Sequence, residues 1–374
     1  MSNIATYLQD HQDEMVEDLV RFVRAESPSL NKSLVDNCGN VLSSIFVERL
    51  GVTPIKFPQQ DRGDHLLFTV GEGPKRVLIL GHFDTVWDEG RLPLVMEDGK
   101  FYGPGVLDMK SGIIQSIWAV KAYLELGYTL NMELAFLCTS DEEVGSQTSR
   151  ALIEEEALKS DLVLVTEPPV AKTGALKTSR KGVGIYEIIA TGVSSHAGNH
   201  HQAGRSAIKE MAHQTLYLES LTKYELGTTV NVGVIHGGTR SNVVPDKATA
   251  QIDFRVETNV EASRMVKELE NLSSFVNGVK LEIVGELNRP PMERTEEIAE
   301  LFEKAKKAAE EIGFGLEEAA AGGGSDGNFT AALGVPTLDG LGCLGEGPHA
   351  EYEHIIIDEL PKRAALVAHL FKEI

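Results

Sequence analysis

The sequence has few cysteines, a shortage of basic side chains and no long apolar run. Its three cysteines, Cys38, Cys138 and Cys343, are odd in number and far apart, so we expect no disulfide framework and a reducing compartment. Lys and Arg number 35 against 56 Asp and Glu, which gives a formal net charge of -21. A protein this acidic repels nucleic acid and anionic membrane surfaces at long range, so neither is an expected partner.

No apolar stretch approaches the roughly 20 residues that a membrane-spanning helix needs. The first residues also lack the basic segment and the apolar segment that together form a secretory leader. These absences favour a cytoplasmic protein. At 374 residues, with 42% hydrophobic side chains, the chain is long enough for two domains with separate cores.

The first part of the chain alternates short β-rich runs with helical patterns. The runs RVLILGHFDTV (76–86) and NMELAFLCTS (131–140) are separated by SGIIQSIWAVKAYLELG (111–127), whose apolar residues suit a buried helix. Buried strands interleaved with helices predict an α/β domain with helices on both faces of a sheet.

The pattern changes after about residue 176 to strand, helix, strand, strand, helix, strand. This order is typical of a ferredoxin-like α+β unit of about 110 residues. Long helical patterns return from about residue 286 onward. We therefore predict one α/β domain built from residues 1–176 and 286–374, interrupted by a small β-α-β-β-α-β domain over residues 177–285.

Imidazole and carboxylate side chains gather after the predicted strands. Six of them follow predicted strands: His82, Asp84, Asp141, Glu142, Glu143 and Glu167. Asp108 lies in a glycine-containing loop before a helix, and His349 lies in a loop late in the chain. Ligands of open α/β sheets bind at the carboxyl ends of the strands, so we expect these groups to meet at one edge. Imidazole with carboxylate is the ligand set of zinc or a similar metal, and the set exceeds what one tetrahedral site requires. Two metal ions that share a carboxylate would use them all.

Structural interpretations of single residues stay open. Asp108 can cap the following helix, and Glu167, before two prolines, can be a turn acid. His354 competes with His349 as the last ligand, although the glycines before His349 favour it because they let its side chain reach a metal. Asp141 has no assigned role. None of these interpretations explains why so many of the groups follow strands.

The sequence resembles the di-zinc metallopeptidase family that includes glutamate carboxypeptidases, aminoacylases, acetylornithine deacetylases and succinyl-diaminopimelate desuccinylases. The motifs that carry the resemblance span nearly the whole chain in the family's order: GHFDTV, YGPGVLDMKSG, TSDEEVGS, TEP, SSHAG, SNVVPDKA and GGGSDGN. Their spacing is most similar to the folate-cleaving glutamate carboxypeptidase branch, which also carries the pair found here at Arg289 and Pro290. The resemblance implies a zinc-exopeptidase-like catalytic domain with a mixed sheet, interrupted by a ferredoxin-like lid or dimerisation domain.

The resemblance also implies a role for each ligand. Asp108 would bridge two zinc ions. His82 and Glu167 would complete one metal site, and Glu143 and His349 would complete the other. The expected cofactor is therefore two Zn2+ per subunit, with Co2+ or Mn2+ as possible substitutes.

Further roles follow from the same resemblance. Glu142 matches the general base, and Asp84 matches the acid that orients the first histidine. The spacing of His82 and Asp84 also permits this role, because residues two apart on a strand point to the same side. His196 matches a histidine that polarises the scissile carbonyl, usually from the partner subunit. Three more residues match positions that bind the substrate's carboxylate end or nearby polar groups: Asn242, Arg255 and Arg289.

Ordinary interpretations remain for these inserted residues. His196 can belong to a surface histidine cluster with His200 and His201, Arg255 can pair with Asp253, and Arg289 can be an exposed linker residue.

The expected reaction is the hydrolysis of an amide bond beside a free carboxylate, most simply release of a C-terminal amino acid such as glutamate. The substrate would be a small peptide or an N-acyl amino acid, and the resemblance implies a homodimer. One alternative is an N-acyl-amino-acid deacylase, desuccinylase or dipeptidase of the same family. Another is a catalytically silent protein that binds a carboxylated ligand or a partner on the same fold.

Overall fold

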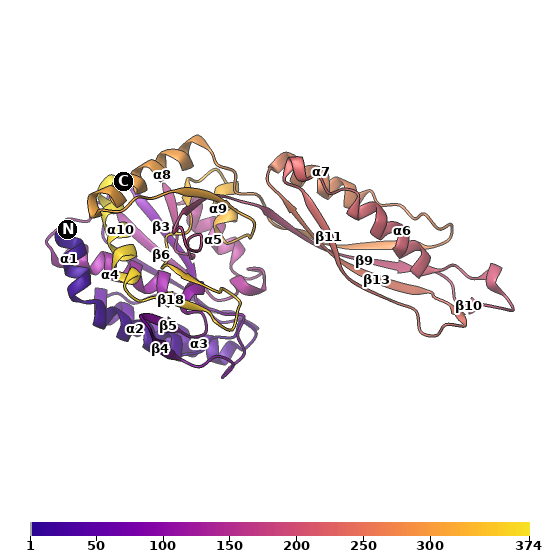
Figure 1. Cartoon of the computed structure of the whole chain (residues 1–374), viewed down its shortest axis with the longest axis horizontal. Helices are drawn as coiled ribbons and strands as arrows, with labels where there is room; N and C mark the ends of the chain where they lie inside the picture. The colour runs from indigo at the N-terminus through magenta and orange to yellow at the C-terminus, as the bar shows by residue number, and fades with distance from the viewer. Residues whose placement is uncertain (1) are drawn as a thin grey trace. The chain divides into compact units, whose positions relative to one another are not determined.

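A computed structural model describes residues 2–374 and divides them into two compact units (Figure 1). The first unit runs up to Ser179 and resumes over Arg294–Ala321 and Ser325–Ile374. The second unit comprises Arg180–Glu293 and Gly322–Gly324. No helix within residues 2–374 is both long and apolar enough to cross a membrane.

The first unit is built on a six-stranded mixed sheet. Its strands lie in the order β1 (Ile55–Phe57), β2 (His65–Val70), β6 (Glu133–Thr139), β3 (Arg76–His82), β7 (Leu162–Val165) and β16 (Thr337–Leu338). β3, β6, β7 and β16 run parallel, whereas β2 is antiparallel to β6 and β1 is antiparallel to β2. The carboxyl ends of the three central strands therefore meet at one edge of the sheet.

Helices cover both faces of this sheet, which explains why its central strands are apolar over most of their length. Val77 and Ile79 of β3 belong to a large core with residues of α1 (Asn3–Asp10), α2 (Gln12–Arg24), α3 (Lys32–Leu50), α4 (Ser111–Glu125), α8 (Glu296–Ile312) and α10 (Glu359–Glu373). The alternate residues Leu78 and Leu80 belong to a second core with residues of α5 (Arg150–Leu158) and α9 (Gly327–Ala332). Successive side chains of a strand point to opposite faces, so the sheet separates these two cores.

A smaller antiparallel sheet shapes the loops around the strand ends. It contains β17 (Gly345–Glu346), β18 (His354–Ile356), β5 (Lys100–Tyr102) and β4 (Val95–Glu97), in this order. The pairing of β18 with β5 brings the chain that leads to Asp108 beside the loop that carries His349. Two short strands, β8 (Leu176–Arg180) and β15 (Glu318–Ala321), form a separate two-stranded sheet.

The second unit has the element order β-α-β-β-α-β. Its elements are β9 (Gly182–Thr191), α6 (Ala207–Glu219), β11 (Thr229–Gly237), β13 (Lys247–Val256), α7 (Asn259–Glu270) and β14 (Lys280–Arg289). The four strands form an antiparallel sheet in the order β11-β13-β9-β14, the arrangement of a ferredoxin-like unit. β14 continues past residue 285, where the sequence placed the end of this domain, because it pairs with β9 as far as Arg289.

Candidate metal centre

His82 ends the central strand β3 and is only 2% exposed. Its Nε2 lies 3.2 Å from Oδ1 of Asp108 and 3.4 Å from Oε1 of Glu167. Its Nδ1 lies 3.1 Å from the backbone oxygen of Asp84. One ring nitrogen thus faces two carboxylates, while the other is directed toward the loop that follows the strand.

Asp108 lies between the two imidazoles that the sequence proposes as ligands. Its Oδ1 faces His82, whereas its Oδ2 lies 3.6 Å from Nε2 of His349. The same Nε2 lies 3.1 Å from Oε2 of Glu143. Ligand atoms of His82, Asp108 and Glu143 all lie within 4.8 Å of one another. The structure therefore brings the five proposed ligands into two groups that share Asp108.

The ligand loops have unusual local conformations. Asp108 lies in the turn Val106–Lys110 and its peptide bond to Met109 is cis. α4 begins only at Ser111 and has Lys110 as its N-cap, so Asp108 does not cap this helix. His349 has a φ of 60°, a left-handed conformation that non-glycine residues seldom adopt. Ligand positions here depend on loops more than on regular elements.

Burial and neighbouring charges shift the pKa values of the side chains in this cluster. Burial opposes a charge on His82, but hydrogen bonds to Asp108 and two other acids raise its pKa well above its ordinary value. Burial raises the pKa of Glu143 to about 7, and the hydrogen bond to Glu143 raises the pKa of His349 to about 9. Burial would raise the pKa of Asp108, yet the hydrogen bond to His82 helps to lower it.

This donor set fits a pair of borderline divalent cations. Two imidazole nitrogens and three carboxylates converge, and the two oxygens of Asp108 face opposite imidazoles. Zinc prefers this mixture of nitrogen and oxygen ligands, and a shared carboxylate is usual where two metal ions lie close together. Positive charge at this position would also offset the repulsion between the buried acids.

Asp84 connects His82, the first proposed ligand, to the paired glutamates. Its buried carboxylate accepts hydrogen bonds from the backbone N–H groups of Glu142 and Glu143, each at 3.2 Å, and from Oγ of Ser29 at 2.7 Å. Its Oδ1 also lies 3.5 Å from Nδ1 of His82. This position lets one side chain orient both the imidazole and the short 3-10 helix Glu142–Val144.

Asp141, whose role the sequence left unassigned, holds the loop of the paired glutamates closed. Its Oδ2 accepts hydrogen bonds from the backbone N–H and the hydroxyl of Thr148, at 2.7 and 2.8 Å. Its backbone oxygen accepts from the N–H groups of Val144 and Ser146. Ser146 in turn donates to Oδ1 of Asp326 at 2.5 Å. The acidic triplet therefore contains one acid that holds the loop, Asp141, and one acid whose carboxylate lies beside His349, Glu143.

Sequence reasoning missed two residues near the cluster. Glu353 is 1% exposed and accepts a hydrogen bond from the backbone N–H of Asp108 at 3.1 Å. The charge of Lys177 helps to lower the pKa of Asp108. Neither residue follows a central strand, so the criterion that selected the ligands could not find them.

His354, the rival of His349, has a structural environment. It is 5% exposed, begins β18, and its Nδ1 lies 2.8 Å from the backbone oxygen of Tyr352. Its ring lies against Tyr102 of the neighbouring strand, with centroids 4.9 Å apart. The structure thus places His349, and not His354, beside Glu143 and Asp108.

Two of the proposed residues of the second unit lie together at one end of its sheet. His196 belongs to β10 (Ser195–His196), which pairs with β12 (Val243–Val244). The backbone N–H of Ala197 donates to the backbone oxygen of Asn242 at 2.9 Å. His196 is exposed, and its Nδ1 accepts the backbone N–H groups of Gly198 and Asn199 at 3.1 and 3.0 Å. This leaves Nε2 of a neutral ring as an outward hydrogen-bond donor.

The other two residues lie at the opposite end of the same sheet. Arg255 and Arg289 are the register partners of Val183 on its two sides. Arg255 forms a two-pronged ion pair with Asp253, as one interpretation of the sequence expected. Arg289 is 4% exposed, so the alternative of an exposed linker residue is wrong.

The two ends of this sheet are far apart. β13 advances eight residues from Lys247 to Arg255, which is roughly 26 Å at the usual rise of a strand. A dipeptide spans at most about 7 Å. His196 and Arg255 of one copy of the second unit therefore cannot both contact the same small substrate.

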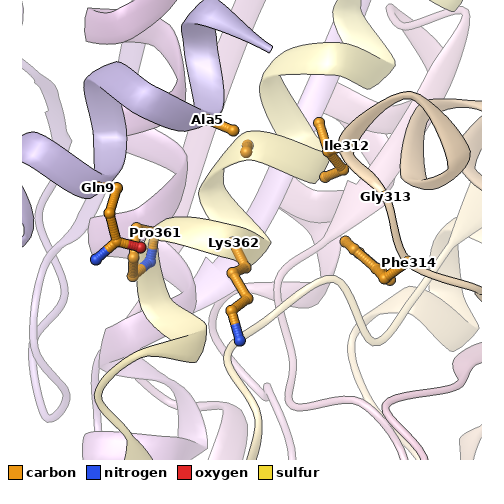
Figure 2. Close-up of a pocket in the computed structure, with 8 residues that line it drawn as sticks. Ala5, Gln9, Ile312, Gly313, Phe314, Pro361 and Lys362 are labelled. Carbon is orange, nitrogen blue, oxygen red and sulfur yellow. The ribbon is translucent and has the colours of Figure 1, made fainter. Parts of the chain in front are cut away.

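A cavity of about 250 Å³ lies in another part of the first unit (Figure 2). Gln9 of α1, Phe314 after α8 and Lys362 of α10 are among the residues that line it. Among residues 2–374, those that line it include no histidine, cysteine, aspartate or glutamate, and these offer no metal-ligating group.

Known proteins resemble this chain over most of its length. The family described as Peptidase family M20/M25/M40 matches residues 78–373. Carboxypeptidase G2 from Pseudomonas sp. (strain RS-16) is 30% identical over 376 aligned residues, which cover 98% of this chain and 90% of that protein. Succinyl-diaminopimelate desuccinylase from Dechloromonas aromatica (strain RCB) is 30% identical over 346 aligned residues, which cover 88% of this chain and 88% of that protein. In fold, the chain resembles the crystal structure of aminopeptidase PepT from Bacillus cereus ATCC 10987, with a TM-score of 0.80, 24% identity, and coverage of 97% of this chain and 98% of that one.

Proposed function

The chain belongs to peptidase family M20/M25/M40 and is a hydrolase, and from this premise we propose that it is a zinc carboxypeptidase that releases a C-terminal amino acid such as glutamate. One observation carries the proposal: Asp108 lies between two imidazoles, His82 and His349, and Glu142 lies in the turn beside them. The name of the carboxypeptidase relative supports the choice of reaction.

Two metal ions would each be held by one imidazole, one glutamate and the shared aspartate: His82, Glu167 and Asp108 for the first, and His349, Glu143 and Asp108 for the second. When bound, they would supply Lewis-acid polarisation of the amide carbonyl and a lower pKa for the attacking water. Zn2+ suits this donor set, and Co2+ or Mn2+ can replace it.

Glu142 acts as the general base. It accepts a proton from the attacking water, whose oxygen bonds to the carbonyl carbon, and then protonates the amine nitrogen as the C–N bond breaks. Its position supports this role, because its backbone is fixed by Asp84 and its charge raises the pKa of both His82 and His349. Glu143, its neighbour, is tied to His349 and serves as a ligand instead.

The second unit supplies the groups that recognise the substrate. The outward N–H of His196 stabilises the oxygen of the scissile carbonyl, and Asn242 lies beside it. Arg289 and Arg255 supply guanidinium groups for the free carboxylate, which a guanidinium binds well. Since about 26 Å of strand β13 separates the two ends of the sheet at which these pairs lie, we propose that a homodimer completes each site, with His196 and Asn242 from the partner.

A second candidate function is hydrolysis of an N-succinyl amino acid. It is favoured by the desuccinylase relative, which is as similar in identity as the carboxypeptidase. Both reactions break an amide beside a carboxylate, so the cluster alone does not separate them.

A side-by-side hydrolysis panel tests the proposal. Zinc-loaded protein is given N-acyl amino acids that end in glutamate, aspartate, leucine or lysine, an N-succinyl diamino acid, and simple dipeptides. Preference for a C-terminal glutamate substrate supports the carboxypeptidase. A preference for the N-succinyl substrate favours the second candidate, and no metal-dependent hydrolysis of any amide would contradict both.

A further inference from the structure

We propose that Glu353 is a positioning residue of the metal centre: its buried carboxylate fixes the loop that presents Asp108. This inference rests on the proposed function, because it assigns a further residue to the same centre. Glu353 itself is not placed among the ligands, and it acts through the backbone of its neighbours.

The contacts of Glu353 carry the proposal. Its Oε1 accepts the backbone N–H groups of Leu107 and Asp108, at 2.9 and 3.1 Å. Its Oε2 accepts the backbone N–H of Gly105 at 3.2 Å and the indole N–H of Trp87 at 2.7 Å. A single side chain that is 1% exposed thus receives four hydrogen bonds, three of them from residues 105–108, the segment that leads to the shared proposed ligand.

This arrangement requires a carboxylate and not merely a polar group. An ionised carboxylate only accepts hydrogen bonds, whereas the amide of glutamine has two N–H donors of its own. Whichever way a glutamine is turned, its NH2 group would face two of the four N–H donors. A buried N–H that loses its acceptor is left without compensation for the water it gave up, so the turn would leave its position.

Glu353 also couples the turn to two other ligand-bearing segments. Trp87 lies in the loop that follows His82 and Asp84. On the other side, Glu353 follows His349 by four residues, and its backbone N–H closes the intervening turn by donating to Ala350 at 2.8 Å. One carboxylate therefore ties together the segments that carry three of the proposed ligands.

The test compares metal binding in the wild type, Glu353→Gln, Trp87→Phe and Glu156→Gln. Glu156 is a matched control: it is 3% exposed in the same unit, and its carboxylate contacts Arg76 and Lys159, which are not ligands. Metal-free protein is titrated with Co2+ against a competing chelator, and the visible absorption of the bound Co2+ reports its coordination geometry. The thermal midpoint of each metal-free variant reports its stability.

We expect Glu353→Gln to bind Co2+ about 10-fold to 100-fold more weakly and with an altered spectrum, the usual scale for residues that orient metal ligands. Glu156→Gln should lower the thermal midpoint while it keeps the wild-type affinity and spectrum. Wild-type Co2+ affinity and spectrum in Glu353→Gln would overturn the proposal.

If Glu353→Gln does not fold, Trp87→Phe decides, because it removes one donor and retains an aromatic ring. Weaker Co2+ binding with a changed spectrum supports the proposal, and binding identical to the wild type overturns it. A wild type that binds no Co2+ would instead contradict the proposed function, and this inference with it.

Discussion

Asp84 accepts the backbone N–H groups of both Glu142 and Glu143, each at 3.2 Å, through its two carboxylate oxygens. The paired glutamates therefore begin a short helix whose orientation is set by a side chain from another strand end. The same Asp84 lies beside His82, so the first proposed ligand and the proposed base share one anchor. In the proposed centre, Asp84 and Glu353 would hold in place the segments that carry the proposed ligands.

Replacing Asp84 by asparagine should weaken the centre. The amide NH2 would face one of the N–H groups that the carboxylate now accepts, and the orientation of His82 would be lost. We expect the metal affinity of Asp84→Asn, its rate of hydrolysis, or both, to fall about 10-fold to 100-fold. Metal content after dialysis, measured beside kinetics, checks this. Unchanged metal content and rate in Asp84→Asn would show that the anchor has no role in the centre.

Glu142 and Glu143 should respond differently to truncation. Glu142→Ala should keep both metal ions but lose roughly 10²-fold to 10⁴-fold in rate, the usual contribution of a general base. Glu143→Ala should lose or weaken one metal ion, because it removes the carboxylate beside His349. Mass-spectrometric metal analysis beside kinetics separates the two outcomes. Equal metal loss in both variants would contradict the assignment.

Metal binding should release protons near neutral pH. In the metal-free protein, the hydrogen bond to Glu143 raises the pKa of His349 from its ordinary value of 6.5 to about 9. The ring therefore stays protonated between about pH 6.5 and pH 9. This proton contributes stability to the metal-free protein that is present below about pH 6.5 and lost as the pH rises through about 9. A metal ion needs the neutral ring and must displace the proton.

Calorimetry measures this proton directly. At about pH 7.5, Zn2+ is titrated into the metal-free protein in two buffers that differ in ionisation enthalpy. The observed enthalpy should differ between the buffers, and the difference should shrink above about pH 9. Identical enthalpies in the two buffers at the lower pH would contradict a protonated His349.

A mixture of two inactive variants tests the dimer. If His196 acts on the partner's metal centre, a dimer of one Glu142→Ala copy and one His196→Ala copy contains one intact site. Random exchange of subunits should then restore about a quarter of the wild-type activity. Activity is measured before and after the two variants are mixed under conditions that permit exchange. If both residues serve one site within a single copy, mixing restores nothing.

The sequence was informative where the fold is regular. β3, β6 and β7 run parallel, so the residues that follow them must meet at one edge of the sheet. Listing the side chains after each strand therefore selected His82, the acidic triplet and Glu167 without any knowledge of the loops, and the family resemblance then singled out Glu143 within the triplet. The ferredoxin-like order of the second unit was equally readable, because each strand and helix there has a clear apolar face.

The remaining features depend on contacts that no local pattern encodes. Glu353 reaches the turn of Asp108 across almost 250 residues of sequence, because β18 pairs with β5. Asp141 looked like a third member of an acidic cluster, yet the hydroxyl and N–H of Thr148 make it a loop anchor. The register of β9 with β13 and β14 places Arg255 and Arg289 far from His196, and the spacing of motifs carries no such distance.

The most direct test of the proposed function is a zinc titration of chelator-stripped protein with two matched substrates. One is an N-acyl-glutamate, and the other is the same compound with its α-carboxylate converted to an amide. We expect no hydrolysis without metal, full activity at two equivalents of Zn2+, and a rate for the blocked substrate that is at least about 30-fold lower, the loss that follows when a charge loses its partner. Hydrolysis that persists without metal, or equal rates for the two substrates, would contradict the account.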